Sequence, residues 1–534
     1  MGKSSQLPYL SRLPLLFLLL LQVSATWVAS NSVYETFVQC LSDQTKQPDL
    51  ISKIVYAQNN PSYTSVLQAY IRNARFNTSS TPKPVIIVTP TNESHVPAAV
   101  VCSKKNGLQI RIRSGGHDYA GISYVSDVPF IILDMFNLRS ITVDMNEQTV
   151  WVQTGATLGE LYYSIWKKSK VHAFPAGVCP TVGVGGHVSG GGYGNMLRKY
   201  GLTTDNVVDA RIVDVNGRIL DKNSMGEDLF WAIRGGGGAS FGVILAYKIN
   251  LVSVPETISV FRAERTLEEN ATDIVYRWQQ VAPTTDENLF MRMLIQPSTS
   301  KVNKGAKTIK ATIIAEFLGK ADDVVALLGK EFPELGLKKE DVKEMSWIDS
   351  VLWWNQNNGT PEFLLNRNPN SADYVRRKSD YVQTPIPKAR LEWLWQRIIE
   401  NGRPGMVFNP YGGKMNKIPI TETAFAHRVG NLFKIQYSVT WEDGGIEAEN
   451  NNTAEIRNLY RLMTPFVSKN PRSAYLNYRD LDIGVSHSGS YAEGKVYGVM
   501  YFNQNFDRLV KVKTAVDPQN FFRNEQSIPT LSSK

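Results

Sequence analysis

The chain has 534 residues, of which 43% are hydrophobic and 20% charged, and its formal net charge is +9 at pH 7. This length suggests two to four domains with a sizeable core, and the composition is that of a globular protein. The basic residues are dispersed and form no run of five like charges, which disfavours nucleic acid as a partner.

Residues 1–30 have the pattern of a secretory signal peptide. Lys3 and Arg12 precede an apolar run at 13–21, and small residues at 28–30 lead to Asn31. This run is about half the length of a membrane-spanning helix, and no later stretch reaches about eighteen uninterrupted apolar residues. We therefore expect a secreted monomer, soluble and without a membrane anchor once the signal is removed, in the apoplast, the cell wall or the vacuole.

The segment 31–253 reads as an α+β module. Strands at 85–88 and 109–113 flank a helix at about 93–106, which predicts a β-α-β start. Further strands are predicted at 130–134, 140–144, 149–153, 207–214 and 242–251, with helices at about 157–168 and 226–233.

The segment 254–472 has longer elements and few glycines, which predicts a second module. Its strand at 433–441 alternates with period two and places Lys434, Gln436, Ser438 and Thr440 on one face. By spacing alone, this face could equally be a solvated one. The tail 473–534 returns to turns, with a turn and a helix start at 517–522. Other elements are predicted as strands at 257–266, 290–295 and 308–318 and helices at 321–331, 387–400 and 450–469.

Three cysteines in a secreted chain leave one unpaired. Cys40 and Cys102 lie in segments that look like helix faces able to pack together, so we pair them. Cys179 stands between prolines, and its thiol could be a buried small hydrophobe, an intermolecular link or an attachment point. Five N-x-S/T triplets fit glycosylation on surface loops; they begin at Asn77, Asn92, Asn270, Asn358 and Asn451.

Glycine clusters are the strongest signal for a bound group. Nine glycines lie between 177 and 201, and two more clusters adjoin predicted strands at 113–119 and 234–238. Such density excludes a regular helix or strand and predicts a close approach to the backbone. Glycine-rich turns with exposed N–H groups, together with Arg113, suit a pyrophosphate. The alternative is a set of flexible surface loops.

Other chemistries are disfavoured by spacing. No cluster fits G-x-G-x-x-G, which argues against a Rossmann dinucleotide fold. Residues 238–242 match the G-x-S-x-G pattern, but the predicted strand follows Ser240 instead of preceding it, so a hydrolase is disfavoured and Ser240 is assigned to a cofactor-facing turn. The six histidines show no metal-binding spacing, and we expect no metal site.

Three motifs resemble those of the berberine bridge enzyme-like family of plant FAD-linked oxidases. They are R-S-G-G-H-D-Y at 113–119, C-P-T-V-G-V-G-G-H at 179–187 and N-Y-R-D-L-D at 477–482. The resemblance implies an α+β fold with a two-lobed FAD-binding domain of the PCMH type, an inserted substrate domain on an antiparallel sheet backed by helices, and a tail that returns to the FAD domain. It also implies FAD bound covalently at two points, through His117 to the flavin 8α position and through Cys179 to C6.

The same resemblance implies the catalytic set. Tyr478 would deprotonate the substrate, Lys434, beside Gln436, would lower the pKa of Tyr478, and Tyr119 and Tyr193 would line the pocket. Residues implied to bind the cofactor are Arg113, Ser114, Gly115, Gly116, Asp118, Ser123, Gly177, Val182, Gly183, Gly186, His187, Gly192, Gly194, Val243 and Asn520.

Two positions refine the expected activity. Founding members carry a glutamate base where this chain has Gln436, which disfavours alkaloid ring closure. Val182 stands where a bulkier leucine accompanies dehydrogenases, which favours O2 as acceptor and release of H2O2. The substrate would be a plant alcohol such as a monolignol, the anomeric hydroxyl of a sugar, or a prenylated phenolic. The alternatives are a pericyclase of the Diels–Alder type without net redox change, and a non-enzymatic defence or allergen glycoprotein.

Overall fold

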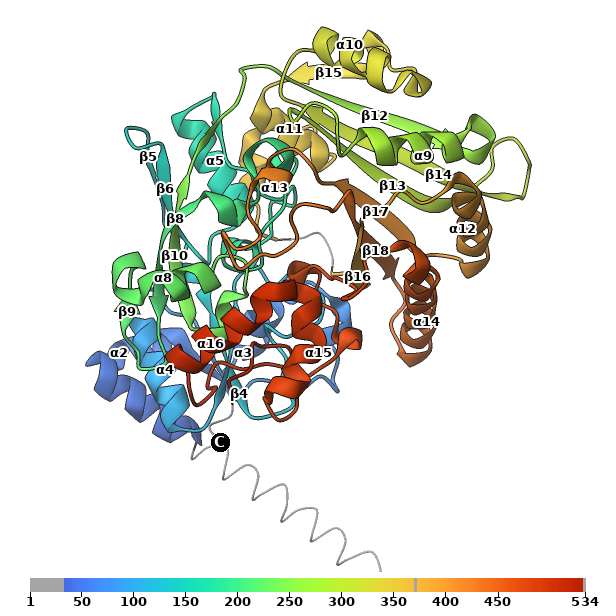
Figure 1. Cartoon of the computed structure of the whole chain (residues 1–534). Coiled ribbons are helices and arrows are strands. Elements are labelled where there is room, and N and C mark those ends of the chain that lie inside the picture. The colour runs from blue at the N-terminus through green and yellow to red at the C-terminus, as the bar shows by residue number, and fades with distance from the viewer. Residues whose placement is uncertain (1–32, 369–371, 532–534) are drawn as a thin grey trace, which may run out of the picture.

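The computed structural model describes residues 33–368 and 372–531. The predicted signal peptide, 1–30, lies outside the described residues. In Figure 1 the first sheet and its helices lie at the lower left, a second sheet stands above them, and a third sheet fills the right-hand side. The last helices of the chain lie between these parts at the bottom of the view.

The first sheet contains the predicted β-α-β unit. Its order is β1-β2-β4-β3, with β1 (Val55–Ala57), β2 (Ile86–Val88), β3 (Gln109–Arg113) and β4 (Phe130–Asp134). Strands β2 and β3 both run parallel to β4, which lies between them. Every residue of β2 and β4 is buried, as expected for parallel strands covered on both faces. The helices of this lobe are α2 (Pro48–Ile54), α3 (Tyr63–Gln68) and α4 (His95–Lys105).

A disulfide joins the N-terminal helix to α4. Residues 33–45 are helical, and Cys40 on this helix is bonded to Cys102 on α4 with a Cα–Cα distance of 5.7 Å. The predicted pairing is confirmed. Cys179 is the free cysteine of the described residues.

The second sheet is antiparallel and has the order β5-β6-β10-β8-β9. Its members are β5 (Ile141–Asp144), β6 (Thr149–Gln153), β8 (Val207–Val213), β9 (Ile219–Leu220) and β10 (Val243–Asn250). A short ladder of β7 (His172–Ala173) and β11 (Val252–Ser253) adjoins it. The helices are α5 (Leu158–Lys168), α6 (Val184–Ser189), α7 (Leu197–Tyr200) and α8 (Lys222–Ala232).

The tail differs from the prediction, because it contains two helices, α15 (Tyr491–Phe502) and α16 (Phe506–Val516). Tyr497, Phe506 and Leu509 of these helices are buried in the core of the second lobe. A Cβ on Gly498 of α15 would lie 2.1 Å from the ring of Phe506, so this glycine allows the two helices to pack closely. The segment 517–522 follows the end of α16, and the predicted helix start there is wrong.

The third sheet has seven antiparallel strands in the order β15-β12-β14-β13-β17-β18-β16. They are β12 (Ile258–Thr266), β13 (Leu289–Thr299), β14 (Lys307–Phe317), β15 (Val342–Met345), β16 (Tyr374–Val382), β17 (Gly405–Pro410) and β18 (Phe433–Trp441). Strands β16 and β17 were not predicted. Nearby helices are α9 (Ala271–Val281), α10 (Ala321–Glu331), α11 (Trp347–Trp354), α12 (Lys388–Asn401), α13 (Lys414–Lys417) and α14 (Ile446–Leu462), and α14 is shorter than the predicted 450–469.

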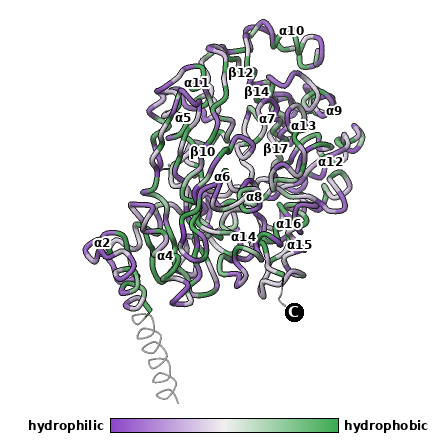
Figure 2. Tube along the Cα trace, turned by 60° about the vertical axis from the view of Figure 1, so that its left-hand side comes forward, coloured by the Kyte–Doolittle hydropathy of each residue, from purple (hydrophilic) through white to green (hydrophobic). Residues whose placement is uncertain are grey.

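The two faces of this sheet have different partners. Phe433, Ile435 and Tyr437 of β18 are buried in a core that also takes in residues of α9, α12 and α14, which lie on the outer side of the sheet in Figure 1. Figure 2 shows hydrophilic and hydrophobic stretches alternating along these surface helices, as amphipathic elements require. The opposite face carries Lys434 and Gln436 and meets Tyr119 of the first lobe and Tyr193 of the second, so the predicted strand face is an interior one.

All five predicted glycosylation sites have exposed asparagines. Asn77, Asn92 and Asn358 lie outside regular helices and strands, and Asn270 directly precedes α9. Asn451 lies inside α14, so the expectation that every site falls on a loop is wrong.

Candidate active site

A row of free backbone N–H groups marks the loop that follows β3. Within the described parts of the chain, the N–H groups of residues 115–119 donate to no other group, although Gly115 and Gly116 are buried. Buried backbone donors without a partner are costly and rare in native proteins. A concave run of such donors fits an anionic group such as a pyrophosphate, which agrees with the cofactor expected for this loop.

The side chain of Arg113 has a different role from the expected one. It is 0% exposed and donates to Asp134 at 2.7 Å and to the carbonyls of Val66 and Leu67 at 2.8 and 2.6 Å. The guanidinium therefore braces β3 against β4 and α3, and its donors do not point to a pyrophosphate. The loop after β3 thus binds through its backbone.

Two more of the expected cofactor residues support the protein scaffold. The carboxylate of Asp118 accepts the N–H groups of Ala120 and Ser123 at 2.9 and 3.2 Å and shapes the turn that follows His117. The side chain of Val243 is 0% exposed and packs in the core of the first lobe. In this structure both side chains therefore support the fold of their segments, and their contact with a cofactor stays a prediction.

The expected glycines mostly allow protein segments to approach one another. A Cβ on Gly115 would lie 2.3 Å from the backbone nitrogen of Gly183, and one on Gly194 would lie 1.8 Å from the carbonyl oxygen of Ala176. Gly186, on α6, is exposed and has nothing within 4 Å of its ideal Cβ position. The groups that approach these glycines closely are therefore mostly other segments of the protein. Gly186 is the exception, because its Cβ position borders space that no protein atom fills. The remaining expected glycines, Gly116, Gly177 and Gly192, also contact other parts of the chain.

The two expected attachment residues lie on loops that touch. His117 Nε2 lies 2.9 Å from Thr181 Oγ1, two residues after Cys179, while its Nδ1 makes no hydrogen bond to the described residues. Burial and the nearby Arg72 lower the pKa of His117 to about 4, so the imidazole is neutral and nucleophilic at neutral pH. The thiol of Cys179 is accessible. The surrounding protein raises its pKa, and Arg292, a residue of β13, opposes this shift.

Two unsatisfied side-chain atoms point to a missing polar partner. Ser123 Oγ and Asn520 Oδ1 are buried without a hydrogen-bond partner, and both belong to the residues expected to bind FAD. Buried polar atoms are normally paired. With the free N–H row and an accessible cysteine, the residues present fit FAD.

His187 ties three expected segments together. Its Nε2 accepts the N–H of Gly177 at 3.1 Å and lies 3.1 Å from Thr203 Oγ1, while its carbonyl accepts from Asn477 Nδ2 at 2.9 Å. Burial, with a smaller effect of Lys434, lowers the pKa of His187 to about 3. The neutral ring thus links Gly177 to Thr203, and the backbone carbonyl of His187 links the glycine-rich loop to the 477–482 motif.

Tyrosines surround Lys434 where the third sheet meets the glycine-rich loop. Its Nζ lies 3.3 Å from the ring centroid of Tyr193, 3.7 Å from that of Tyr475 and 4.5 Å from that of Tyr478. The side chain is 0% exposed, and Nζ has no hydrogen-bond partner among the described residues. Tyr478 Oη donates to Tyr193 Oη at 2.8 Å, and the Tyr119 and Tyr478 rings lie 5.9 Å apart. The five expected catalytic side chains therefore meet, since Gln436 Nε2 also donates to Tyr119 Oη at 3.3 Å.

Burial favours the neutral forms of both Lys434 and Tyr478 in this cluster. Burial, reinforced by Arg292, lowers the pKa of Lys434 well below 10.5. Burial and the neighbouring Tyr193 and Tyr119 raise the pKa of Tyr478 well above 10. Each group alone is therefore pushed towards its neutral form, and the expectation that Lys434 lowers the pKa of Tyr478 stays a prediction.

Arg292 and Tyr475 belong to the site and were not predicted. Arg292 donates to Asn409 Oδ1 at 2.9 Å and to Tyr193 Oη at 3.5 Å, and its charge acts on Cys179, Lys434 and Tyr478. Tyr475 Oη accepts the N–H of Gly192 at 3.1 Å. Strand alternation puts Arg292 on the other face of the sheet from Met291 and Met293. Nothing in the sequence indicated which loop would pack against the face that carries Arg292.

Residues 33–368 and 372–531 contain no cluster of three histidine, cysteine, aspartate or glutamate residues able to hold a metal ion. No helix in these ranges has the length and apolar character needed to cross a membrane.

Fold and site together define an FAD-dependent oxidoreductase, and comparisons with known proteins make the class specific. The FAD binding domain family matches residues 84–222, and the berberine and berberine-like family matches residues 474–529. Berberine bridge enzyme-like 21 of Arabidopsis thaliana is 62% identical over 518 residues, which cover 96% of this chain and 95% of that protein. Berberine bridge enzyme-like 19 of the same plant is 59% identical, over 98% and 92%. The chain belongs to the berberine bridge enzyme-like family, as its motifs predicted.

Solved structures confirm the α+β fold. Berberine bridge enzyme from Eschscholzia californica is 36% identical with a TM-score of 0.87, covering 93% of this chain and 100% of that one. The grass pollen allergen Phl p 4, described as having glucose dehydrogenase activity, is 43% identical with a TM-score of 0.88 and the same coverage. A Phl p 4 variant with isoleucine replaced by valine is described as a glucose oxidase. Another, with asparagine replaced by histidine five residues further on, is described as a glucose dehydrogenase.

Proposed function

We propose that the chain is an oxidase that binds FAD covalently through His117 and Cys179, oxidises the anomeric hydroxyl of a sugar and releases hydrogen peroxide. One observation carries the proposal: the free N–H row 115–119 ends at Tyr119, whose ring contacts Tyr478. A cofactor held by that row is thus next to the tyrosine cluster. His117 Nδ1 and the Cys179 thiol, both free of hydrogen bonds or disulfides, are the nucleophiles for attachment.

In this proposal Tyr478 removes the hydroxyl proton of the substrate. Lys434 and Tyr478 titrate as a pair, because each disfavours its charged form alone. When the pair has lost one proton, a proton on Lys434 leaves Tyr478 as a phenolate stabilised by the adjacent ammonium. Bound FAD supplies the acceptor for the hydride from the anomeric carbon, and O2 takes up the two electrons and two protons as H2O2. Gln436 and Tyr193 orient the hydroxyl.

Val182 supports oxygen as the acceptor. In Phl p 4 the two altered positions are five residues apart, and this chain carries valine and histidine at the same spacing, as Val182 and His187. The Phl p 4 variant that gained valine is the one described as an oxidase, whereas the variant that gained only histidine is a dehydrogenase. We propose that Val182 occupies the corresponding position.

The charge of the pocket favours a sugar that carries a carboxylate. Arg292 and Arg377 both exert their positive charge on Cys179, and Arg377 lies 5.6 Å from the ring centroid of Tyr119. Register places Arg377 opposite Ser438, on the sheet face that carries Lys434 and Gln436. The guanidinium of Arg377 is held by the Val439 carbonyl at 2.6 Å and by Thr440 Oγ1 at 3.1 Å, and its fixed positive charge attracts carboxylates. We therefore propose that uronic acids are preferred over neutral sugars.

Matched sugars test this function. Anaerobic mixing with glucuronate and galacturonate, and with glucose and galactose, should bleach the flavin absorbance, fastest with the uronates, and air should restore it with one H2O2 per cycle. Arg377→Gln should lower kcat/KM for glucuronate and leave that for glucose unchanged. Coniferyl alcohol serves as the non-sugar comparison: bleaching by this alcohol and by none of the sugars would refute the carbohydrate proposal.

Further parts of the proposal concern the whole protein. We propose domain bounds of 31–253 for the FAD-binding domain, 254–472 for the substrate domain and 473–534 for the returning segment. We also propose a secreted monomer glycosylated at the five sequons. The disulfide supports secretion, because such bonds persist in oxidising compartments.

A further inference from the structure

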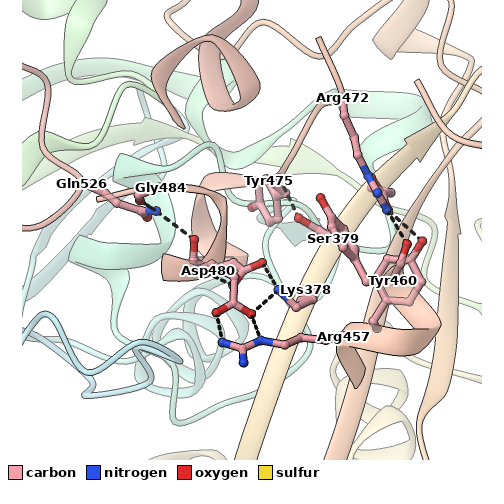
Figure 3. A network of polar contacts seen from close by, with 12 residues as sticks. Lys378, Ser379, Arg457, Tyr460, Arg472, Tyr475, Asp480, Gly484 and Gln526 are labelled. Atoms are coloured by element: carbon pink, nitrogen blue, oxygen red, sulfur yellow. Dashed lines mark hydrogen bonds and ion pairs between the residues drawn. The ribbon is translucent and has the colours of Figure 1, made fainter. Parts of the chain in front are cut away.

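The segment that carries Tyr478 is gripped at both ends by two successive residues of strand β16. At one end, Ser379 Oγ accepts the N–H of Tyr475 at 2.8 Å. At the other, Lys378 Nζ lies 2.7 Å from an oxygen of Asp480 and 2.7 Å from one of Asp482. Figure 3 shows Lys378 and Ser379 on their strand, with Tyr475 and Asp480 around them.

We infer that Lys378 is a positioning residue for Tyr478, acting through Asp480. The inference rests on the proposed function, in which Tyr478 takes the substrate proton. Strand β16 is the edge strand of the third sheet and pairs Ser379 with Gln436 and Tyr381 with Lys434. One strand therefore sets the place of the residues around the base and holds the segment that carries the base itself.

Successive strand residues point to opposite faces, so Lys378 and Ser379 hold the 475–482 segment from opposite faces of the sheet. Ser379 lies on the face of Gln436, inside the site. Lys378 lies on the other face, where its Nζ is 4.9 Å from the ring centroid of Tyr460. The 475–482 segment crosses the sheet edge between these two anchors. Lys378 is 3% exposed, and a buried ammonium charge is stabilised when carboxylates pair with it; Asp480 and Asp482 supply that pairing.

Asp480 has a partner for each of its polar groups, so its conformation is tightly defined. Its N–H donates to Tyr501 Oη at 3.1 Å, and its carbonyl accepts from Gln526 Nε2 at 2.8 Å. One carboxylate oxygen accepts the N–H of Asp482 at 3.0 Å, and the other pairs with Lys378. Asp480 is two residues from Tyr478, so a shift at Asp480 moves the phenol.

Loss of the Lys378 charge should act on Asp480 in particular. Asp482 has a second cation, since Arg457 Nε donates to it at 2.8 Å, and it would remain paired. Asp480 would keep a buried charge next to Asp482 without a counter-ion, a strongly unfavourable arrangement. The turn would then open towards water at the end that follows Tyr478.

The test compares Lys378→Met, which keeps the length of the side chain and removes the charge, with Lys378→Arg, which keeps the charge. Arg75→Met is the matched control, because Arg75 forms a partly buried ion pair with Glu449 of α14 at 2.6 Å, outside the site. Two measurements are made on the flavin-loaded protein: amide hydrogen exchange of the 475–482 peptide, and the rate of anaerobic flavin reduction at saturating glucuronate.

We expect Lys378→Met to raise exchange in this peptide and to slow reduction by about 100-fold, the scale of an ångström-sized misplacement, with little change in KM. Lys378→Arg should restore most of the rate, and Arg75→Met should alter neither readout. Unchanged exchange in Lys378→Met, or raised exchange with a wild-type reduction rate, would overturn the inference. If no sugar reduces the wild-type flavin, the carbohydrate proposal fails, and exchange with reduction by coniferyl alcohol then decides the role of Lys378.

Discussion

Replacement of Lys434 by methionine should lower the catalytic rate and raise the stability of the folded protein. Lys434 is 0% exposed, has no hydrogen-bond partner and has a pKa well below 10.5. Methionine keeps an unbranched side chain of similar length and fills the space beside the rings of Tyr193, Tyr475 and Tyr478. The proposed pair mechanism then loses the group that holds the shared proton, while the fold loses an unfavourable buried amine.

The expected magnitudes follow from the lowered pKa. Below about 10.4 the unfolded chain binds a proton at this lysine, whereas the folded protein does so only below its lower pKa. Wild-type stability therefore rises with pH between the two values, by about 1.4 kcal/mol per pH unit for this group. Lys434→Met lacks this dependence. Its Tm should exceed that of the wild type, most at pH values below the folded-state pKa and progressively less as pH approaches 10.4.

Activity should change the other way. Without the ammonium group of Lys434, Tyr478 stays a neutral phenol and cannot serve as the base. Because loss of a general base typically costs about 10²–10⁴-fold in rate, anaerobic flavin reduction in Lys434→Met should fall by that order. The wild-type rate should rise with pH through one ionisation that belongs to the Lys434–Tyr478 pair. In the variant this ionisation should move up towards that of Tyr478 alone, whose pKa is raised above 10.

Three measurements would check this reasoning: Tm against pH, flavin reduction rate against pH, and the same two profiles for Tyr478→Phe. Tyr478→Phe should be slow and lack the ionisation, while its stability keeps the pH dependence that Lys434 causes. A Lys434→Met variant with the wild-type pH–rate profile would refute the pair mechanism. A variant less stable than the wild type at acid pH would refute the lowered pKa.

Other substitutions test the remaining parts of the site. His117→Ala and Cys179→Ala should each keep one covalent flavin bond, and the double variant should release all flavin on denaturation, read as flavin absorbance in the supernatant after acid precipitation. Val182→Ile should slow reoxidation by O2 by about 10–200-fold, the usual effect of one methylene in a close-fitting site, and leave reduction by substrate unchanged in stopped-flow measurements; equal reoxidation rates would contradict the role of Val182. Replacement of Cys40 and Cys102 by alanine opens a link between residues 62 apart and should cost about 4 kcal/mol of unfolding free energy by loop entropy, measured by denaturant titration against the wild type with its disulfide intact.

Sequence periodicity predicted the elements whose apolar residues are buried and whose polar residues alternate regularly with them. Strand β18 was predicted at its observed bounds because five apolar residues alternate with polar ones. Strand β16 was missed because Lys378 and Asp380 read as surface residues. Both are buried, since Lys378 meets Asp480 and Arg472 Nη2 lies 2.5 Å from Asp380. Partners about a hundred residues away cannot be seen in a local pattern.

The site shows a similar division. The histidine, the cysteine and the tyrosines came from long motifs, and their meeting follows from the order of segments in the family fold. Arg292 carried no such signal, because its role depends on which strand lies opposite the glycine-rich loop. Arg113 was predicted to bind a phosphate because it stands beside glycines, whereas its guanidinium forms an ion pair with Asp134. Counter-ions, which decide such cases, become visible only in three dimensions.

The returning segment explains why catalysis in this chain requires all of its parts. Tyr478 enters the site from this segment, whereas Lys434 comes from the third sheet and Tyr119 from the loop after β3. The same segment continues into α15 and α16, which fill the core of the second lobe, and Lys513 of α16 is buried against Asp517 and the carbonyl of Ser240. Packing of the tail into that core therefore brings Tyr478 to Lys434, so the proposed base and its partner meet only when the third sheet and the two other lobes are folded and docked.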